Sequence, residues 1–323
     1  MHLKKYGGIV MNQDKEQLDE LFSEQKIHKI IIKSKYRQLL KMIMTALLVI
    51  VFVWQGNTLL GEHLSNKLYK KLEAAVIVQV PNGYLSYIDT TIGLGGAKIN
   101  YTISKNLLYK KADIEKGIIK AGYYQNDLEW HTWTMQEEWP IERWQEGVRK
   151  LMFFHPGLEY KTYKNDLNLL EQISDAQIME LGLSFDRAYT LSEVQEWLKD
   201  YKVQWLWLDA YSKTSLEEMK KEIHEKGPNM SFILEDKLIG VNLWNNNINS
   251  DLSEYDKLMD CLKNNKEPKY QQAYETLQDK HYTTLENAKF LGAIIIADKE
   301  ELEALGQDNR IKAISLGVTA NKY

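Results

Sequence analysis

The stretch Lys41–Leu60, KMIMTALLVIVFVWQGNTLL, decides how the rest of the chain is organised. From Met42 to Leu60 it holds 19 residues without a charged side chain. A helix rises about 1.5 Å per residue, so roughly 20 apolar residues cross the hydrocarbon core of a bilayer. A buried core helix is the alternative, but such a helix rarely contains a run like Leu47–Val53, because one of its faces usually meets water. The stretch therefore predicts a transmembrane helix at residues 42–60.

Flanking charge predicts the orientation of this helix. Basic residues crowd the side that precedes it, and positions 26–41 contain no acidic residue. The segment after the helix, Gly61–Ala75, carries fewer basic residues, so the positive-inside rule places the N-terminus in the cytoplasm. The apolar run starts too far into the chain for an ordinary signal peptide, which indicates an uncleaved, single-pass signal anchor. We expect four of the preceding basic residues to set this topology and to contact anionic lipid: Lys33, Lys35, Arg37 and Lys41.

The anchor divides the chain into parts. We predict a cytoplasmic tail at 1–41, the membrane helix at 42–60, a first extracytoplasmic lobe at 61–170 and a second at 171–323. A net charge of −4 with 27% charged residues is ordinary for a soluble extracytoplasmic part. Cys261 is the single cysteine, so no intramolecular disulfide can form. An extracytoplasmic domain without disulfides is typical of a Gram-positive bacterium rather than of a eukaryotic secretory protein.

The first ten residues, MHLKKYGGIV, differ in character from the tail that begins at Met11. Their Gly-Gly pair stands a few codons before Met11, as a ribosome-binding site read in frame would. We therefore expect translation to start at Met11. The genomic DNA tests this expectation, because the two glycine codons must then spell such a site.

The tail from Met11 onward has an acidic half and a basic half. Within the acidic half, Leu18, Leu21 and Phe22 are spaced i, i+3, i+4, which places them on one face of a short helix. A segment this short does not fold alone, so an apolar face on it needs a cover. A partner protein and the membrane surface are the two candidates. We take the three residues as the candidate partner-binding face.

The part after the membrane helix alternates between strand and helix patterns. Ala74–Val80, AAVIVQV, predicts a strand that is stopped by the turn signal Pro81-Asn82-Gly83. Two strand–helix–strand units lie nearer the C-terminus, one from Gln177 to Leu208 and one from Leu291 to Val318. Short units of this kind indicate an α+β extracytoplasmic domain with mixed or antiparallel sheets.

Tryptophans gather in one segment of the predicted first lobe: Trp130, Trp133, Trp139 and Trp144. Indole faces stack well on sugars, so these residues are a candidate sensor or binding platform. The alternative is that they simply pack a core or a membrane-facing surface.

The constellations that carry enzyme chemistry are missing from the sequence. There is no G-x-S-x-G and no H-E-x-x-H, and Cys261 has no histidine near it in the chain. The seven histidines are scattered, which argues against a metal site. We therefore expect no catalytic residue, no cofactor and no metal, and a protein that is not an enzyme. A glycosidase stays open as an alternative, because its two carboxylates can lie far apart in a chain.

Several segments together resemble the bacterial sigma factor regulator family, with its N-terminal and C-terminal domains. The stretch KLYKKLEAAVIVQVPNGYLSYIDTTIGLGGAKINYTISKN looks like the start of that family, with Pro81, Asn82, Gly83 and Tyr84 at its centre. Five further segments resemble the C-terminal half of that family: LMFFHPGLEYKTYKNDLNLLEQI, LGLSFDRAYTLSEVQEWL, WLWLDAYSK, LGAIIIADKEELEAL and IKAISLGVT. The similarity runs, with gaps, from about residue 25 to about residue 320.

The resemblance implies a membrane-bound anti-sigma factor. Members of the family are thought to hold an extracytoplasmic-function sigma factor at the membrane and to release it on envelope stress. One departure is that the short tail lacks the zinc-binding H-x-x-x-C-x-x-C element of many anti-sigma factors. The alternative is an extracytoplasmic envelope-binding or assembly module without a sigma partner. Direct binding to nucleic acid is not expected, since the basic residues lie beside the predicted membrane helix.

Overall fold

The computed structural model describes residues 24–123, 144–145, 148–226, 232–244, 253–302 and 305–322. The chain divides into two compact units, Met1–Glu62 and His63–Tyr323. Each unit is described by itself.

A single long helix, α2 (Glu24–Gln79), contains 56 residues. Its apolar run is exposed to its surroundings; Phe52, for example, is 77% exposed. Such a helix is long and apolar enough to cross a membrane, and is compatible with a single-pass anchor. The basic residues predicted to set the topology, Lys33, Lys35, Arg37 and Lys41, are also exposed on it.

The strand predicted at Ala74–Val80 is wrong, because α2 continues through Gln79. Leu72 and Val76 share one helix face, Val80 follows directly after the helix, and all three pack in the core of the three-stranded sheet. Val78 lies on another face and joins the core of the five-stranded sheet. A helix end buried on two sides carries apolar residues all round, and this composition resembles that of a strand.

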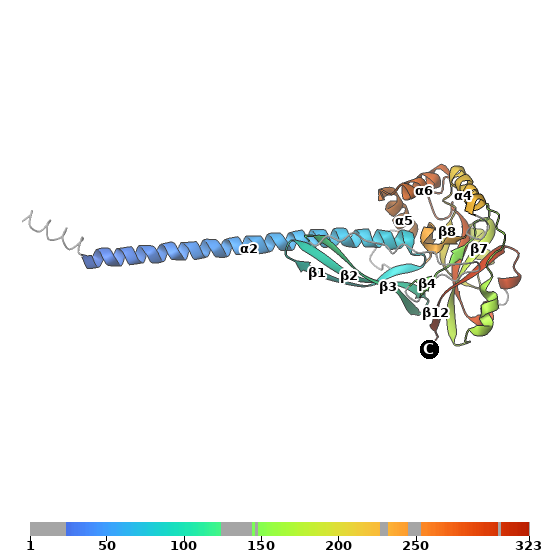
Figure 1. The fold of residues 1–323 in the computed structure, drawn as a ribbon, viewed down its shortest axis with the longest axis horizontal. Coiled ribbons are helices and arrows are strands. Elements are labelled where there is room, and N and C mark those ends of the chain that lie inside the picture. The colour runs from blue at the N-terminus through green and yellow to red at the C-terminus, as the bar shows by residue number, and fades with distance from the viewer. Residues whose placement is uncertain are drawn as a thin grey trace, which may run out of the picture. The chain divides into compact units, whose positions relative to one another are not determined.

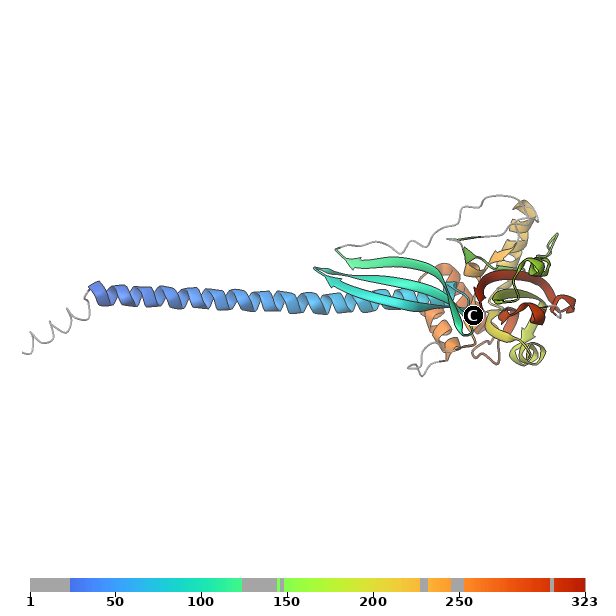
Figure 2. The same cartoon turned by 90° about the horizontal axis from the view of Figure 1, so that it is seen from below.

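Three antiparallel strands form the first sheet, in the order β1-β2-β3. They are β1 (Gly83–Gly93), β2 (Gly96–Leu107) and β3 (Lys110–Gly122). The predicted turn at 81–83 is confirmed, with Asn82 at a φ of +59°. β1 starts beside Val80 and runs back along α2, and the sheet covers the last turns of the helix (Figures 1 and 2).

A five-stranded sheet with the order β10-β8-β11-β7-β12 forms the C-terminal part, and every neighbouring pair is antiparallel. The predicted strand–helix–strand units are present, but neither unit has adjacent strands. β11 lies between the strands that α3 connects, and β7 lies between the strands that α7 connects. This is a split β-α-β arrangement. The bounds are β7 (Gln177–Thr190), α3 (Leu191–Trp197), β8 (Lys202–Leu208), β10 (Gly240–Asn242), β11 (Lys289–Ala297), α7 (Lys299–Leu302) and β12 (Ile311–Asn321).

Most of the other elements are inserted between β8 and β11 or precede β7. The insertion holds α4 (Lys213–Lys226), β9 (Ile233–Leu234), the 3₁₀ turn η3 (Glu235–Lys237), β10, α5 (Glu254–Asn264) and α6 (Pro268–Asp279). Before β7 come β4 (Trp144–Gln145), β5 (Val148–Arg149), β6 (Met152–Phe153) and η1 (Asp166–Gln172), and η4 (Leu305–Gln307) follows α7. The expectation of an α+β fold with antiparallel sheets is thereby confirmed.

The five-stranded sheet is buried on both faces. One face packs under the helices: Leu181 and Leu183 of β7 belong to the same core cluster as Leu258 and Leu262 of α5. The other face is aromatic, with Trp205 and Trp207 of β8 against Phe153 of β6. Helix α3 starts with a capping box, in which Thr190 and Glu193 satisfy each other's backbone N–H groups.

The outer edge of β12 is closed by the segment that leads into η1. The N–H of Ile314 donates to the carbonyl of Lys164 at 2.9 Å, and the N–H of Leu316 donates to the Asp166 carboxylate at 2.8 Å. Arg149 and Lys164 hold that carboxylate by ion pairs of 3.2 and 3.0 Å. At the opposite edge, β10 is only 3 residues long.

Candidate functional site

The sites predicted from the sequence fall largely outside the described residues. This is true of Leu18, Leu21 and Phe22 in the tail and of Trp130, Trp133 and Trp139. Trp144 begins β4, where its backbone pairs with Arg149 of β5. The candidate partner-binding face and the tryptophan platform therefore stay predictions.

The described residues bring together a buried polar cluster that sequence reasoning did not predict. We call it the junction cluster; its members are Asn82, Lys105, Glu180 and Glu235. Asn82 follows α2, Lys105 lies on β2, Glu180 on β7 and Glu235 in η3. The exposed fraction of the two carboxylates and the lysine is at most 2%. The cluster therefore joins the end of α2 and the three-stranded sheet to the five-stranded sheet.

Lys105 is the centre of the junction cluster. Its Nζ lies 2.8 Å from Glu180 Oε2 and 2.6 Å from Glu235 Oε2. Burial alone would lower the pKa of Lys105, but the two carboxylates outweigh it, so the pKa of Lys105 is raised. Lys150 approaches the other oxygen of Glu235 at 3.4 Å. Two ammonium groups thus face two carboxylates, as a buried ionic group requires.

Asn82 completes the cluster through its side-chain amide. Its Nδ2 donates to the carbonyl of Asn106 at 2.8 Å and to Glu180 Oε1 at 3.2 Å. Its Oδ1 accepts from Nε1 of Trp244 at 3.0 Å. Asparagine tolerates the left-handed backbone found here better than most residues. The Pro-Asn-Gly segment is therefore both a turn and the hydrogen-bonded end of α2.

The pKa of Glu180 is raised overall. Burial is the largest cause of this rise. The Lys105 ammonium acts against it and lowers the pKa, whereas the Glu235 carboxylate adds to it. A signal for Glu180 was present in the sequence, since it is a single charge inside the apolar strand IMELGLSF. Its partners could not be read from the sequence, because Lys105 and Glu235 are remote from it and from each other along the chain.

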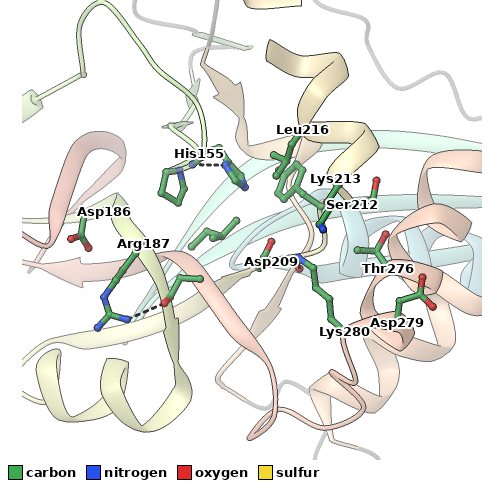
Figure 3. A pocket seen from close by; sticks show the side chains of 15 residues that line it. His155, Asp186, Arg187, Asp209, Ser212, Lys213, Leu216, Thr276, Asp279 and Lys280 are labelled. Carbon is green, nitrogen blue, oxygen red and sulfur yellow. Dashed lines mark hydrogen bonds and ion pairs between the residues drawn. The ribbon is translucent and has the colours of Figure 1, made fainter. Parts of the chain in front are cut away.

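A pocket of about 730 Å³ opens beside His155, at the side of the five-stranded sheet (Figure 3). Ligand sites commonly have a volume of this order. His155 is 4% exposed, and its ring packs edge-on to those of Tyr211 and Trp207, with centroids 4.7 and 5.9 Å away. Leu216 of α4 and Leu291 of β11 add apolar surface to the wall.

The imidazole of His155 has one used and one unused nitrogen. Nδ1 accepts from the backbone N–H of Gly157 at 2.9 Å, so the neutral ring carries its proton on Nε2. Within the described part of the chain, Nε2 has no hydrogen-bond partner. Burial lowers the pKa of His155 to about 4, with smaller and opposed effects of Asp209 and Lys280, so the ring is neutral at neutral pH. An oxygen of a ligand could accept from this N–H.

Both acidic and basic residues line the pocket. Lys280 pairs with Asp209 at 2.7 Å and also donates to the carbonyl of Asp209 at 3.1 Å. The guanidinium of Arg187 lies 4.0 Å from the centroid of the Tyr189 ring. Apolar walls, one buried N–H donor and charges of both signs suit the binding of a polar molecule with an apolar part.

Residues 170–318 match the family model described as sigma factor regulator C-terminal. The matched range contains β7 to η4 and most of β12. It confirms the resemblance to sigma factor regulators in this part of the chain. No curated protein and no solved structure matches the chain significantly.

Proposed function

We propose that this chain, whose residues 170–318 match the sigma factor regulator C-terminal model, is a membrane-bound anti-sigma factor for an extracytoplasmic-function sigma factor. The observation that carries the proposal is the family match on a chain with one long, exposed, apolar helix. The role is binding rather than catalysis, and it needs no contact with DNA.

The proposed inhibitory element is the tail. Leu18, Leu21 and Phe22 would bury one apolar helix face against the sigma factor. Basic residues next to the membrane, Lys33 to Lys41, would keep this tail in the cytoplasm and close to the lipid surface. A sigma factor held there would be removed from RNA polymerase.

The proposed input is the outer part, and envelope stress is the proposed stimulus. A signal from outside has to reach α2, and the contacts nearest its end are the junction cluster and the packing of Leu72, Val76 and Val80. A change of packing there, or cleavage of the outer part by a protease, would change the position of the helix. The tail would then bind the sigma factor more weakly.

A bacterial two-hybrid assay tests the proposal. The full-length chain and the segment 11–41 are each paired with the extracytoplasmic-function sigma factors of the host. We expect both to bind one of them, and Leu21→Asp and Phe22→Asp to abolish binding, because a charge on the apolar face has to be desolvated at the interface.

Ser23→Asp is the matched control, since it adds the same charge next to the face without removing an apolar side chain. It should leave binding intact. If the full-length chain binds no sigma factor of the host, the anti-sigma proposal is wrong. If Ser23→Asp abolishes binding as completely as Phe22→Asp, the contact face is not the one proposed.

The His155 pocket favours a second candidate function, an extracytoplasmic envelope-binding module. Its specific support is the buried N–H of His155 without a described partner in a pocket of about 730 Å³. Purified full-length chain in detergent would then bind cell-wall polymer, and His155→Phe would weaken the binding, since phenylalanine keeps the ring and removes the donor. Equal binding by His155→Phe would contradict this role of the pocket.

A further inference from the structure

The far end of the three-stranded sheet carries exposed apolar side chains. We call this end the sheet tip and define it by Ile92, Leu94 and Tyr123. Leu94, in the turn between β1 and β2, is 82% exposed, and Ile92 is 37% exposed. Tyr123, just after β3, is 87% exposed, and its N–H donates to the carbonyl of Gly95 at 3.1 Å. The three residues therefore belong to one end of the sheet.

Exposed apolar residues that occur singly are normal, but several together at one protruding end mark an interaction site. The flanks of the sheet tip are basic: Lys98 of β2 is the cross-strand neighbour of Lys120 of β3. The sheet tip thus combines aliphatic side chains with a tyrosine and neighbouring lysines. This composition is typical of a segment that lies in the interface of a membrane with anionic headgroups.

The short chain between the apolar run and the sheet is a second argument for a membrane contact at the sheet tip. From Leu60, where the run ends, to Leu72, which packs under the sheet, a helix rises about 18 Å. β1 contains 11 residues and spans about 36 Å from Gly83 to the sheet tip. β1 also runs antiparallel to the last turns of the helix (Figures 1 and 2). Only a short stretch of chain thus connects the apolar run to the part of the helix on which the sheet packs.

We infer that the sheet tip inserts into the outer surface of the bilayer that α2 spans, with an anionic phospholipid surface as its partner. Leu94 and Ile92 enter the interface, the ring of Tyr123 lies at headgroup level, and Lys98 and Lys120 face the phosphates. The inference rests on the membrane anchoring in the proposed function, and it adds a second, peripheral contact between the outer part and the lipid.

Fluorescence quenching by lipids tests the inference. The full-length chain with Cys261→Ser and Leu94→Cys is labelled with an environment-sensitive nitrobenzoxadiazole dye. It is reconstituted into vesicles of equal parts phosphatidylglycerol and phosphatidylethanolamine, with or without nitroxide groups on the acyl chains. The dye at position 94 is expected to shift to the blue in vesicles and to lose most of its emission when the nitroxide lipids are present.

Two matched positions serve as controls in the same Cys261→Ser background. Tyr109→Cys labels the turn at the opposite end of the sheet; Tyr109 is 64% exposed, and the dye there should keep its emission. Phe52→Cys labels the apolar run of α2 and should be quenched whenever this helix spans the bilayer.

The outcomes separate the inference from the proposed function. Quenching at 94 and 52 but not at 109 supports the inserted sheet tip. Quenching at 52 alone overturns it and leaves the membrane anchor intact. No quenching at 52 overturns the anchor and the inference together. A blue shift at 94 without quenching means that protein covers the sheet tip, for example in a second copy of the chain, and this also overturns the inference.

Discussion

Replacing Lys105 by methionine should strongly destabilise the unit His63–Tyr323. Methionine has a similar length but no charge, so Glu180 and Glu235 would keep their buried places without the ammonium between them. Removing one partner of a buried ion pair costs about 3–5 kcal/mol of unfolding free energy. With a urea m value of about 3 kcal/mol/M, the unfolding midpoint should fall by about 1–2 M.

Urea unfolding of the full-length chain in detergent measures this effect. Intrinsic tryptophan fluorescence reports on it, because Trp205 and Trp207, two of the nine tryptophans, are buried beside the sheet and become exposed on unfolding. The matched control is Lys111→Met. Lys111 is 53% exposed and pairs with Asp113 at 3.2 Å, and such surface pairs contribute about 0–1 kcal/mol.

The destabilisation should also depend on pH. The pKa of Glu180 is raised in the folded state, so its protonated form is favoured there. A group of this kind contributes stability that is present below its ordinary pKa of 4.5 and is lost as the pH rises through the raised value. Without Lys105 the pKa of Glu180 rises further, so Lys105→Met should cost less stability at about pH 5 than at about pH 8. An effect no larger than that of Lys111→Met would refute the picture of a desolvated cluster.

Three other predictions concern single side chains. The pKa of His155 falls from 6.5 to about 4 on folding, so unfolding free energy should drop by about 3 kcal/mol as the pH falls from 6.5 to 4. His155→Phe should remove this part of the slope in urea titrations at several pH values. Gly240→Ala should lower stability by about 1–3 kcal/mol, because the added Cβ meets the Trp205 ring and the carbonyl of Leu206; Gly93→Ala, with open space around it, is the control, and equal melting of the two variants would contradict the packing argument. Asn82→Ala should destabilise more than Asn82→Gly, since both lose the amide hydrogen bonds but glycine accepts the positive φ at lower cost; the reverse order of melting temperatures would argue against backbone strain at this turn.

Local patterns predicted much of the secondary structure. The strand–helix–strand patterns from Gln177 to Leu208 and from Leu291 to Val318 and the turn at Asn82 depend on neighbours within a few residues, and each is present. The end of α2 was mistaken for a strand because two different cores bury it. Its side chains meet residues far along the chain, and no local pattern records that.

The candidate sites show the same limit. The Lys105–Glu180 and Lys105–Glu235 pairs join residues 75 and 130 positions apart, so their contact depends on how the two sheets and η3 pack together. His155 is one of seven scattered histidines in the sequence, and its pocket is assembled by residues from β11, α4 and α6 as well as from the loop after β6.

The partly covered edge of β12 has a consequence for the membrane anchoring proposed above. An open strand edge offers unpaired N–H and C=O groups on which another chain can add a strand, and this is a common start of aggregation. Here Lys164 and Asp166 already accept from two of the N–H groups, and the other edge strand is very short. Copies of an anchored protein diffuse in two dimensions and meet often. If α2 anchors the chain as proposed, neighbouring copies in the membrane would find little open edge on the five-stranded sheet to which a strand could be added.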